Sequence, residues 1–339
     1  MLHFECDYAR GCHPRLMEAL CRTNKDATAG YGEDPYCAEA IEYIRSAIGK
    51  PNAQVHFLVG GTQTNATVIA ALLSPWQGVI SAATGHVTGH EAGAIEQSGH
   101  KVITLPSHEG KITSADLESY MEVYTHDEAR EHIVEPGMVY ISFPTEYGTI
   151  YSRGELEALH NTCRRYDLRL FLDGARLGYG LAAAGDLTLR DIADLCDVFY
   201  IGGTKVGALF GEAAVFPEPG LCRAFFTVMK QHGAVLAKGR LLGVQFAELF
   251  RDGLYEEISR NAVARARELK AVLHQKGYEF FLETPTNQQF VVVSPAKLRE
   301  LQEKVCLSVW EPRGADYVIR LCTDWATTPG EIEELSRIL

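Results

Sequence analysis

The first two thirds of the chain alternates between short apolar runs and longer segments in which apolar residues recur three or four positions apart. The short runs predict strands, and the longer periodic segments predict amphipathic helices. One helix is predicted from Cys37 to Ile48, ending at Gly49, and another over Thr62–Leu73. The predicted strands lie at residues 55–59, 79–82, 101–105, 138–142, 169–172 and 198–201. This alternation is typical of an α/β fold with a mostly parallel sheet covered by helices.

The pattern changes after about residue 240. Two long charged helices are predicted there, at residues 241–250 and 255–276. They are followed by a strand at 289–293, a helix at 295–304, a strand at 317–322 and a last helix from Pro329. We therefore predict a large α/β domain over residues 1–245 and a smaller C-terminal α+β domain over residues 246–339.

Composition and charge narrow the classes of function. The formal net charge of −12 disfavours a general nucleic-acid or anionic membrane surface, and no apolar run is long enough to span a membrane. The N-terminus carries acids where a signal peptide would carry a basic head and an apolar stretch. Nine cysteines without a Cys-x-x-Cys pair are typical of reduced thiols. We expect a cytoplasmic protein with neither nucleic-acid nor membrane partners.

A glycine-rich turn follows the first predicted strand of the sheet. Gly60 and Gly61 precede Thr62 at the start of a predicted helix. Free backbone N–H groups and the positive end of the helix dipole make such a turn a candidate phosphate site. The alternative is an ordinary tight turn in which Thr62 caps the helix.

A carboxylate follows another predicted strand, at Leu170-Phe171-Leu172-Asp173. The carboxyl ends of strands are where ligands bind in open α/β sheets. A carboxylate at this position can keep a ring nitrogen protonated, which makes a pyridine ring an electron sink. The alternative is that Asp173 caps the next helix.

A lysine completes the set. The strand ending at Ile201 leads through Gly202 and Gly203 to Thr204 and Lys205, with apolar residues beyond. Poor solvation lowers the pKa of a lysine side chain and makes its neutral amine available for imine formation. The alternative is that Lys205 is an ordinary surface lysine. A phosphate turn, a strand-end aspartate and this lysine are the three groups that pyridoxal 5′-phosphate needs. The sequence therefore predicts an enzyme that binds this cofactor as a Schiff base on Lys205.

The chain also resembles a known family over nearly all of its length. The matching motifs are Phe4–Asp7, Tyr31–Asp34, Gly60–Asn65, His86 with Glu91–Ala94, Pro144–Gly148, Asp173–Arg176, Gly203–Lys205 and Val318–Leu321. In order and spacing they are similar to those of low-specificity threonine aldolases, in the β-eliminating lyase group of fold type I pyridoxal-phosphate enzymes. The resemblance implies the transferase-like fold of that class, with a large cofactor-binding domain and a small C-terminal domain.

The resemblance also implies roles at the cofactor. Lys205 would be the Schiff-base lysine and Asp173 would bind the pyridinium nitrogen. Gly61 and Thr62 would hold the phosphate. His86 would stack on the cofactor ring near the substrate hydroxyl, as a candidate base. Two further residues, Thr204 and Arg176, are counted with the cofactor-binding set.

The remaining implied roles concern the substrate and a neighbouring subunit. Arg176 and Arg320 would clamp the substrate α-carboxylate, a task that suits the planar donors of guanidinium. Asp7 would lie at the edge of the site. Tyr31 would reach into the active site of a neighbouring subunit of a homodimer or homotetramer. Lys230 or Lys238 would contribute a basic group to the phosphate across that interface.

Several of these residues have simpler interpretations. His86 and His90 could be metal ligands on a helix, but Gly85 and Gly89 argue against a helix, no third ligand follows, and we predict no metal site. Arg176 could cap a helix or pair with Asp173 or Asp186, and Arg320 could be an edge-strand charge. The Tyr31–Asp34 segment could be a turn followed by the acidic start of a helix.

One position departs from the family pattern. Many threonine aldolases have a second histidine in the segment that here reads Pro144-Thr145-Glu146-Tyr147-Gly148. A carboxylate at Glu146 could act as the base if its pKa suited the task, or it could position a water molecule. We count Glu146 among the substrate-binding residues.

The predicted reaction is a retro-aldol cleavage of β-hydroxy-α-amino acids, such as L-threonine or L-allo-threonine, to glycine and an aldehyde. The nearest alternative is a β-eliminating lyase on the same scaffold that forms pyruvate and ammonia. A non-catalytic binding protein that kept the fold is a second alternative. A nucleotide-binding oxidoreductase is disfavoured, because no dinucleotide fingerprint follows the first strand.

Overall fold

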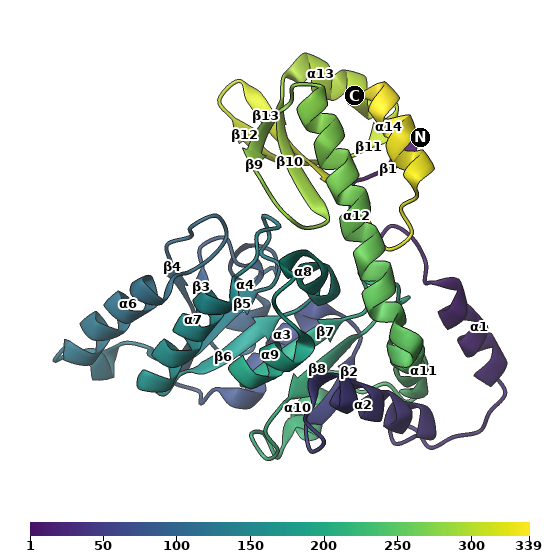
Figure 1. The fold of residues 1–339 in the computed structure, drawn as a ribbon. Coiled ribbons are helices and arrows are strands. Elements are labelled where there is room, and N and C mark those ends of the chain that lie inside the picture. Colours follow the sequence, from purple (N-terminus) through teal and green to yellow (C-terminus); the bar gives the residue numbers. More distant parts are fainter.

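The computed structural model describes residues 1–339, and its centre is a seven-stranded sheet with the order β2-β8-β7-β6-β5-β3-β4 (Figure 1). The strands are β2 (Gln54–Leu58), β3 (Gln77–Ala82), β4 (Val102–Leu105), β5 (Glu135–Ser142), β6 (Arg169–Asp173), β7 (Val198–Gly202) and β8 (Glu212–Phe216). All neighbouring strands are parallel except β8, which is antiparallel to both β2 and β7. The predicted α/β class with a mostly parallel sheet is confirmed. Strand β8 was not predicted from the sequence.

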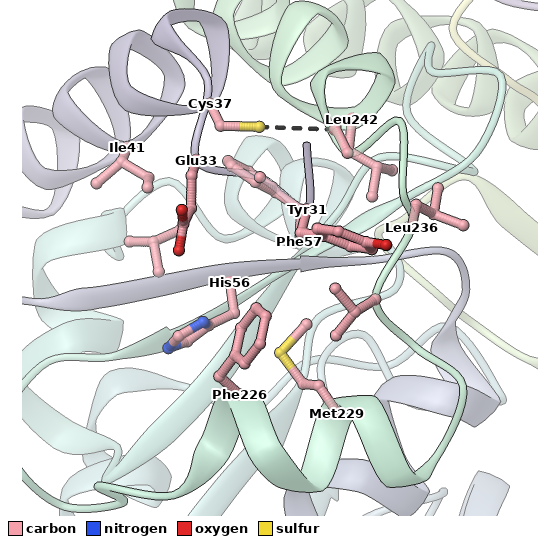
Figure 2. A pocket seen from close by; sticks show the side chains of 14 residues that line it. Tyr31, Glu33, Cys37, Ile41, His56, Phe57, Phe226, Met229, Leu236 and Leu242 are labelled. Carbon is pink, nitrogen blue, oxygen red and sulfur yellow. Dashed lines mark hydrogen bonds between the residues drawn. The ribbon is translucent and has the colours of Figure 1, made fainter. Parts of the chain in front are cut away.

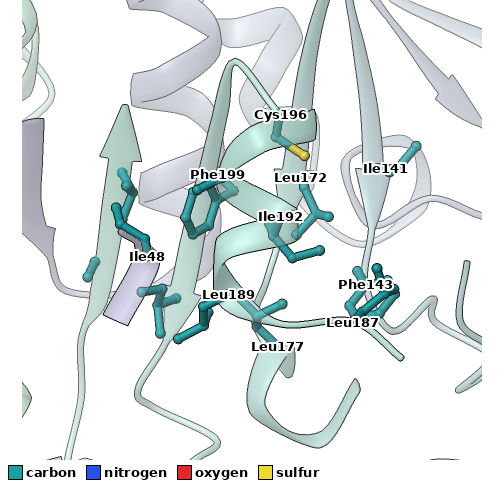
Figure 3. Close-up of a cluster of buried hydrophobic side chains, with 14 of the residues drawn as sticks. Ile48, Ile141, Phe143, Leu172, Leu177, Leu187, Leu189, Ile192, Cys196 and Phe199 are labelled. Atoms are coloured by element: carbon teal, nitrogen blue, oxygen red, sulfur yellow. The ribbon is translucent and has the colours of Figure 1, made fainter. Parts of the chain in front are cut away.

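Helices cover both faces of this sheet, and the strand alternation determines which side chains face which layer. Two hydrophobic cores flank the sheet, a larger and a smaller one. Val139, Leu172 and Phe199 belong to the larger core. Their chain neighbours Tyr140, Phe171 and Tyr200 belong to the smaller core. Because successive side chains of a strand point to opposite faces, each central strand supplies both cores. Figure 3 shows part of the larger core, where α8 and α9 pack on the sheet.

Twelve α-helices precede the C-terminal part of the chain. They are α1 (Pro14–Thr23), α2 (Pro35–Ile48), α3 (Gly61–Leu72), α4 (His86–Gly89), α5 (Ala94–Gln97), α6 (Ser114–His126), α7 (Arg153–Arg165), α8 (Leu177–Ala184), α9 (Leu189–Leu195), α10 (Phe225–Gln231), α11 (Arg240–Phe250) and α12 (Leu254–Gln275). Helix α2 ends as predicted, at Gly49 with a φ of 68°, a left-handed conformation that glycine adopts at little cost. None of the helices combines the length and the apolar character needed to cross a membrane.

The C-terminal part contains a four-stranded antiparallel sheet with the order β12-β13-β10-β9. The elements of this C-terminal part are β9 (Glu279–Leu282), β10 (Gln288–Val293), α13 (Pro295–Gln302), β11 (Val305–Cys306), β12 (Ser308–Arg313), β13 (Asp316–Cys322) and α14 (Pro329–Ile338). The N-terminal strand β1 (Leu2–His3) pairs with β11, so both chain ends lie in this part (Figure 1). The long helix α12 contributes Ile258 to the larger core and Leu273 to the C-terminal core. The domain boundary near residue 245 stays a prediction.

Candidate active site

The candidate site lies at the carboxyl ends of the parallel strands β5, β6 and β7. Because these strands pair in register, Ser142 at the end of β5 lies opposite Asp173 at the end of β6. Together with the start of α3 and the turn after β7, they enclose a cavity of about 280 Å³. The cavity brings together eight of the residues proposed from the sequence: Gly61, Thr62, His86, Glu146, Asp173, Arg176, Thr204 and Lys205.

Asp173 is buried and accepts hydrogen bonds from four donors. The Tyr200 hydroxyl and the Ala175 N–H donate to Oδ1, at 2.5 and 3.0 Å. The Tyr140 hydroxyl and the Asn65 side-chain amide donate to Oδ2, at 2.5 and 3.0 Å. Burial by itself would raise the pKa of the Asp173 carboxyl, but the charge of His86 and the tyrosine hydrogen bonds outweigh burial and lower it. The side chain is therefore a buried carboxylate that stays charged.

The alternation along the strands explains why these donors meet Asp173. Tyr140, Phe171 and Tyr200 all belong to the smaller core, so their side chains lie on one face of the sheet. Asp173 lies two positions after Phe171, so its side chain points to the same face of the sheet. Asn65 comes from α3, which packs on this face. The alternative in which Asp173 caps the next helix is wrong, because Arg176 occupies the N-cap position of α8 and no side chain caps that helix.

The glycine-rich turn forms the start of α3. The helix begins at Gly61, its N-cap is Gly60, and no side chain caps it. The alternative in which Thr62 caps the helix is therefore wrong, and the first-turn N–H groups are available to an anion. A Cβ at Gly61 would lie 3.0 Å from the Tyr200 hydroxyl, so glycine fits here beside the Asp173 network.

Lys205 lies in a tightly closed loop between β7 and β8. The N–H groups of Gly203 and Thr204 both donate to the Gly211 carbonyl, at 3.0 and 3.1 Å. The Tyr179 hydroxyl donates to the Lys205 carbonyl at 2.6 Å and fixes the backbone beside the cavity. Burial, followed by the charge of Arg176, lowers the pKa of the Lys205 amine. A lowered pKa increases the fraction of neutral amine, which is the nucleophilic form.

A chain of buried polar groups connects Asp173 to His86. The Asn65 amide donates to Asp173 and also to Glu91 Oε1, the latter at 2.7 Å. The same Glu91 oxygen lies 2.7 Å from His86 Nδ1. Burial alone would lower the pKa of the His86 imidazole, but the Glu91 hydrogen bond and the charges of Asp173 and Glu91 raise it.

The structure corrects one local prediction around His86. Residues His86–Gly89 form the one-turn helix α4, although Gly85 and Gly89 argued against a helix. Gly85 precedes the turn and packs tightly, since a Cβ there would lie 2.2 Å from the Ser81 hydroxyl oxygen. The His86 and His90 rings are 5.7 Å apart.

Glu146 is a buried carboxyl on the cavity wall beside His86. Its Oε1 accepts from the His86 backbone N–H at 2.9 Å and from the Ser142 hydroxyl at 2.6 Å. Its Oε2 is buried without a hydrogen-bond partner. Burial raises the pKa of this carboxyl, partly offset by the Ser142 hydrogen bond. One oxygen is therefore fixed, while the other remains available for a proton or a ligand.

Arg176 and Asp7 form a buried bidentate ion pair. Arg176 Nε lies 2.6 Å from Asp7 Oδ2, and Nη2 lies 3.0 Å from Oδ1. The partners proposed for Arg176 as an alternative, Asp173 and Asp186, were therefore wrong. The Asn287 amide also donates to Asp7, at 3.0 Å. Burial would raise the pKa of Asp7, but the charge of Arg176 and the other favourable contacts lower it to about 2.

Arg320 lies on β13, outside the residues that line the cavity. It is buried, and its guanidinium donates to Gln288 Oε1 at 3.0 Å and to the Glu5 carbonyl at 2.9 Å. Its Nε is buried without a partner. The alternative of an edge-strand charge is wrong, because β13 is an inner strand between β12 and β10.

Tyr31 lies apart from the Lys205 cavity, in a second, mostly apolar pocket (Figure 2). Its side chain is half exposed, and its φ of 61° is rare for a residue with a side chain. The Tyr31 N–H donates to the Ala237 carbonyl at 3.1 Å, and Lys230 Nζ is 4.6 Å from the Tyr31 ring centre. Lys238, directly after Ala237, is also exposed. The residues assigned to a neighbouring subunit are thus grouped together, away from the cavity of their own chain.

The residues present fit pyridoxal phosphate. Lys205 supplies an amine of lowered pKa, Asp173 supplies a buried charged carboxylate, and the first turn of α3 supplies free N–H groups for a phosphate. Several residues that shape the site had no role predicted from the sequence: Asn65, Glu91, Tyr140, Tyr200 and Glu212. The alternation that predicted the strands could have placed Tyr140 and Tyr200 on the face of Asp173, but not their hydrogen bonds.

Comparison with known proteins decides the family. The model of the beta-eliminating lyase family matches residues 6–296. The chain belongs to this family. The predicted resemblance is thereby confirmed, and the family makes this chain a lyase whose cofactor is pyridoxal phosphate. A low-specificity L-threonine aldolase of Pseudomonas sp. is 30% identical over 308 residues, covering 89% of this chain and 87% of the relative.

Two further relatives agree. The low-specificity L-threonine aldolase of Saccharomyces cerevisiae is 25% identical, over 82% of this chain and 70% of its own length. A solved structure of Leishmania major threonine aldolase superimposes with a TM-score of 0.96 at 40% identity, covering 100% of this chain and 98% of that one. An aspartate aminotransferase of Thermus thermophilus, with a TM-score of 0.70 at 18% identity, shares the fold alone. The fold type I architecture is thus confirmed.

Proposed function

We propose that this protein cleaves β-hydroxy-α-amino acids, with L-threonine and L-allo-threonine as the first candidates, into glycine and an aldehyde. The observation that carries this proposal is the contact between His86 and Glu146 beside Lys205 in one cavity. A retro-aldol reaction must remove a proton from a substrate hydroxyl group, and these residues offer an imidazole and a free carboxyl oxygen for it. Support comes from the similarity to threonine aldolases over most of the chain.

Three groups prepare the cofactor site. When bound, pyridoxal phosphate withdraws electrons from the bonds of the substrate's α-carbon. We assign its covalent attachment to Lys205 and the protonation of its ring nitrogen to the Asp173 carboxylate. Gly61, Thr62 and Thr204 lie on the cavity wall where they can hold the phosphate.

Other side chains bind and deprotonate the substrate. Arg176 would bind the substrate α-carboxylate through Nη1, because Asp7 already occupies Nε and Nη2. Arg320 does not line the cavity, but its Nε is buried without a partner, and we assign it a supporting role for the same carboxylate. Glu146 Oε2 would take the proton of the β-hydroxyl group, and the His86 ring would cover the cofactor and orient that hydroxyl.

We also propose a homo-oligomer, either a dimer or a tetramer, with shared active sites. Tyr31 and Lys230 form one exposed contact away from their own cavity, where a second copy could receive them. Lys238 is the other candidate for the basic group that reaches the partner's phosphate. The location that we propose is the cytoplasm, because nine free cysteines are typical of a reducing compartment.

Product analysis tests the proposal. The purified protein, loaded with pyridoxal phosphate, is incubated with L-threonine, L-allo-threonine and L-phenylserine. We expect glycine in equal amount to acetaldehyde or benzaldehyde. Pyruvate and ammonia would instead indicate β-elimination, and no product from any of the three amino acids would overturn the aldolase assignment.

A further inference from the structure

Glu212 is a buried carboxyl at the centre of the cofactor site, and the proposed function gives it no role. It is the first residue of β8 and lies between Gly202, the last residue of β7, and Leu58, the last residue of β2. Those two strands lead directly into the Lys205 loop and into the turn at Gly61. The start of β8 therefore lies between the elements assigned to the covalent attachment and to the phosphate.

The contacts of Glu212 fix its carboxyl on the cavity wall. The residue is 3% exposed and lines the same cavity as Gly61, Thr62 and Thr204. Its Oε2 accepts a hydrogen bond from the Gly203 N–H at 3.0 Å. This contact and a hydrogen bond with the Thr204 side chain tie the carboxyl group to the Lys205 loop, on the wall of the cavity.

A charged carboxylate at this position would oppose the cofactor. A phosphate monoester carries a charge of about −1.5 to −2 at neutral pH, and like charges in a buried site repel strongly. The cations of the cavity have other partners: Arg176 is paired with Asp7, and His86 is paired with Glu91. Lys205 is reserved for covalent attachment. No other cationic side chain of this chain lines the cavity, so a further cation at the phosphate comes only from a neighbouring subunit, as proposed above for Lys230 or Lys238.

We propose that Glu212 binds the phosphate group of the cofactor as a neutral carboxylic acid, donating a hydrogen bond from its own proton. A neutral acid removes the repulsion and adds a donor beside the N–H groups of α3. This inference rests on the cofactor part of the proposed function and is independent of which amino acid is cleaved.

The surroundings of Glu212 favour the neutral form. Burial raises the pKa of its carboxyl to about 8, with the Asp173 charge acting in the same direction. The Thr204 hydrogen bond, the charge of Lys205 and the Gly203 N–H act in the opposite direction, but burial outweighs them. Tyr200 and Tyr255 are the other titratable groups near it, and both remain neutral because burial raises their pKa values. A bound phosphate would raise the Glu212 pKa further.

Binding of a cofactor analogue that cannot react with Lys205 tests the proposal. The probe is 4-deoxypyridoxine 5′-phosphate, which lacks the aldehyde, titrated calorimetrically into the full-length apoprotein between pH 7 and pH 9.5. We expect the wild-type Kd to rise by up to about tenfold per pH unit above the Glu212 pKa, because only the protonated site binds. The phosphate itself has a second pKa of about 6 and stays a dianion over this range.

Glu212→Gln is the decisive variant, since its amide keeps an acceptor for the Gly203 N–H and supplies a permanent neutral donor. We expect its Kd at pH 7 to stay within about threefold of wild type and to lose the rise above pH 8. A Kd that is tenfold or more weaker at pH 7, or an unchanged rise at high pH, would overturn the proposal.

Two controls isolate the phosphate contact. Glu248→Gln removes another buried carboxylate, which lies on α11 and pairs with Arg15 of α1, and it should keep the wild-type pH dependence. Unphosphorylated 4-deoxypyridoxine should bind weakly with the same pH dependence in wild type and in Glu212→Gln. A pH effect of Glu212→Gln on this second probe would contradict a contact to the phosphate. Since no substrate is present, failure here leaves the product analysis unaffected.

Discussion

Glu91 Oε1 lies 2.7 Å from Nδ1 of His86, and the Glu91 side chain is closed to solvent. The hydrogen bond directs Nδ1 away from the cavity, which leaves Nε2 as the only ring nitrogen for a ligand. It also contributes to the raised pKa of the imidazole. Glu91 therefore positions the His86 ring and favours its protonated form, although Glu91 itself does not line the cavity.

The first prediction concerns this pair. Glu91→Gln keeps a polar atom beside Nδ1 but removes the negative charge, so the pKa of His86 should fall. We expect kcat to decrease by up to about 10²-fold, because a misplaced reacting group costs about that much. The pH profile of kcat and the imidazole chemical shifts measure the effect. Glu96→Gln, an exposed acid on the neighbouring helix α5, should change neither. An unshifted His86 pKa in Glu91→Gln would contradict the positioning role.

The second prediction concerns the charge of Asp173. Asp173→Asn offers one acceptor oxygen to the donors of Tyr140, Tyr200 and Asn65, and it loses the negative charge. We expect the rate of glycine formation to fall by about 10²–10³-fold, the usual effect of losing one preorganised electrostatic group. Tyr140→Phe is the matched control, because it removes one hydrogen bond but keeps the carboxylate. If both variants lost activity equally, the charge would not be the decisive feature.

How far sequence predicted the site depends on the kind of contact. Asp173 and Lys205 follow apolar strands, and their positions could be predicted because the carboxyl ends of parallel strands meet at one edge. The partners of Asp173 could not be predicted, since they depend on the register between β5, β6 and β7. The strand β8 was missed because Glu212-Ala213-Ala214 begins it with residues of low strand propensity. Consequently Glu212 had no recognisable place in the site.

The ion pair between Asp7 and Arg176 shows a second limit of sequence reasoning. The two residues are 169 positions apart, and nothing local connects them. The alternative interpretation of Arg176 paired it with the nearby Asp173 or Asp186, whereas the buried partner comes from the N-terminal segment. Long-range pairing of this kind follows from the packing of the N-terminal segment against the start of α8 and cannot be inferred from spacing.

The third prediction is the effect of this ion pair on stability. Removing one partner of a buried pair typically costs about 3–5 kcal/mol, so Asp7→Asn should lower the free energy of unfolding of the apoprotein by a value of that order. The folded pKa of Asp7 lies below its ordinary value, at about 2 against 3.8. The pair therefore stabilises fully above about pH 4, and the stabilisation is lost as the pH falls through 2.

Denaturant unfolding between pH 2 and pH 7 measures this effect. The difference between wild type and Asp7→Asn should be constant near neutrality and shrink towards pH 2. Asp252→Asn serves as the control, because this exposed acid lies 3.5 Å from Arg15 and should contribute less than about 1 kcal/mol. If both variants lowered the free energy of unfolding equally, the buried pair between Asp7 and Arg176 would stabilise the protein no more than an exposed one.

The last prediction concerns Glu146 as the base for the substrate hydroxyl. A base must be ionised to accept a proton, so kcat should rise with pH through the Glu146 pKa, which burial has raised above its ordinary value. Glu146→Gln should reduce kcat by about 10²–10⁴-fold and remove this acidic limb of the pH profile.

A second variant, Ser142→Ala, should shift the acidic limb of the pH profile and not remove it. The Ser142 hydroxyl stabilises the charged carboxylate through the bond to Oε1, so without it the acidic limb should move to higher pH. If Glu146→Gln kept both the rate and the pH profile, a different group would have to remove the hydroxyl proton, and His86 would be the remaining candidate in the cavity.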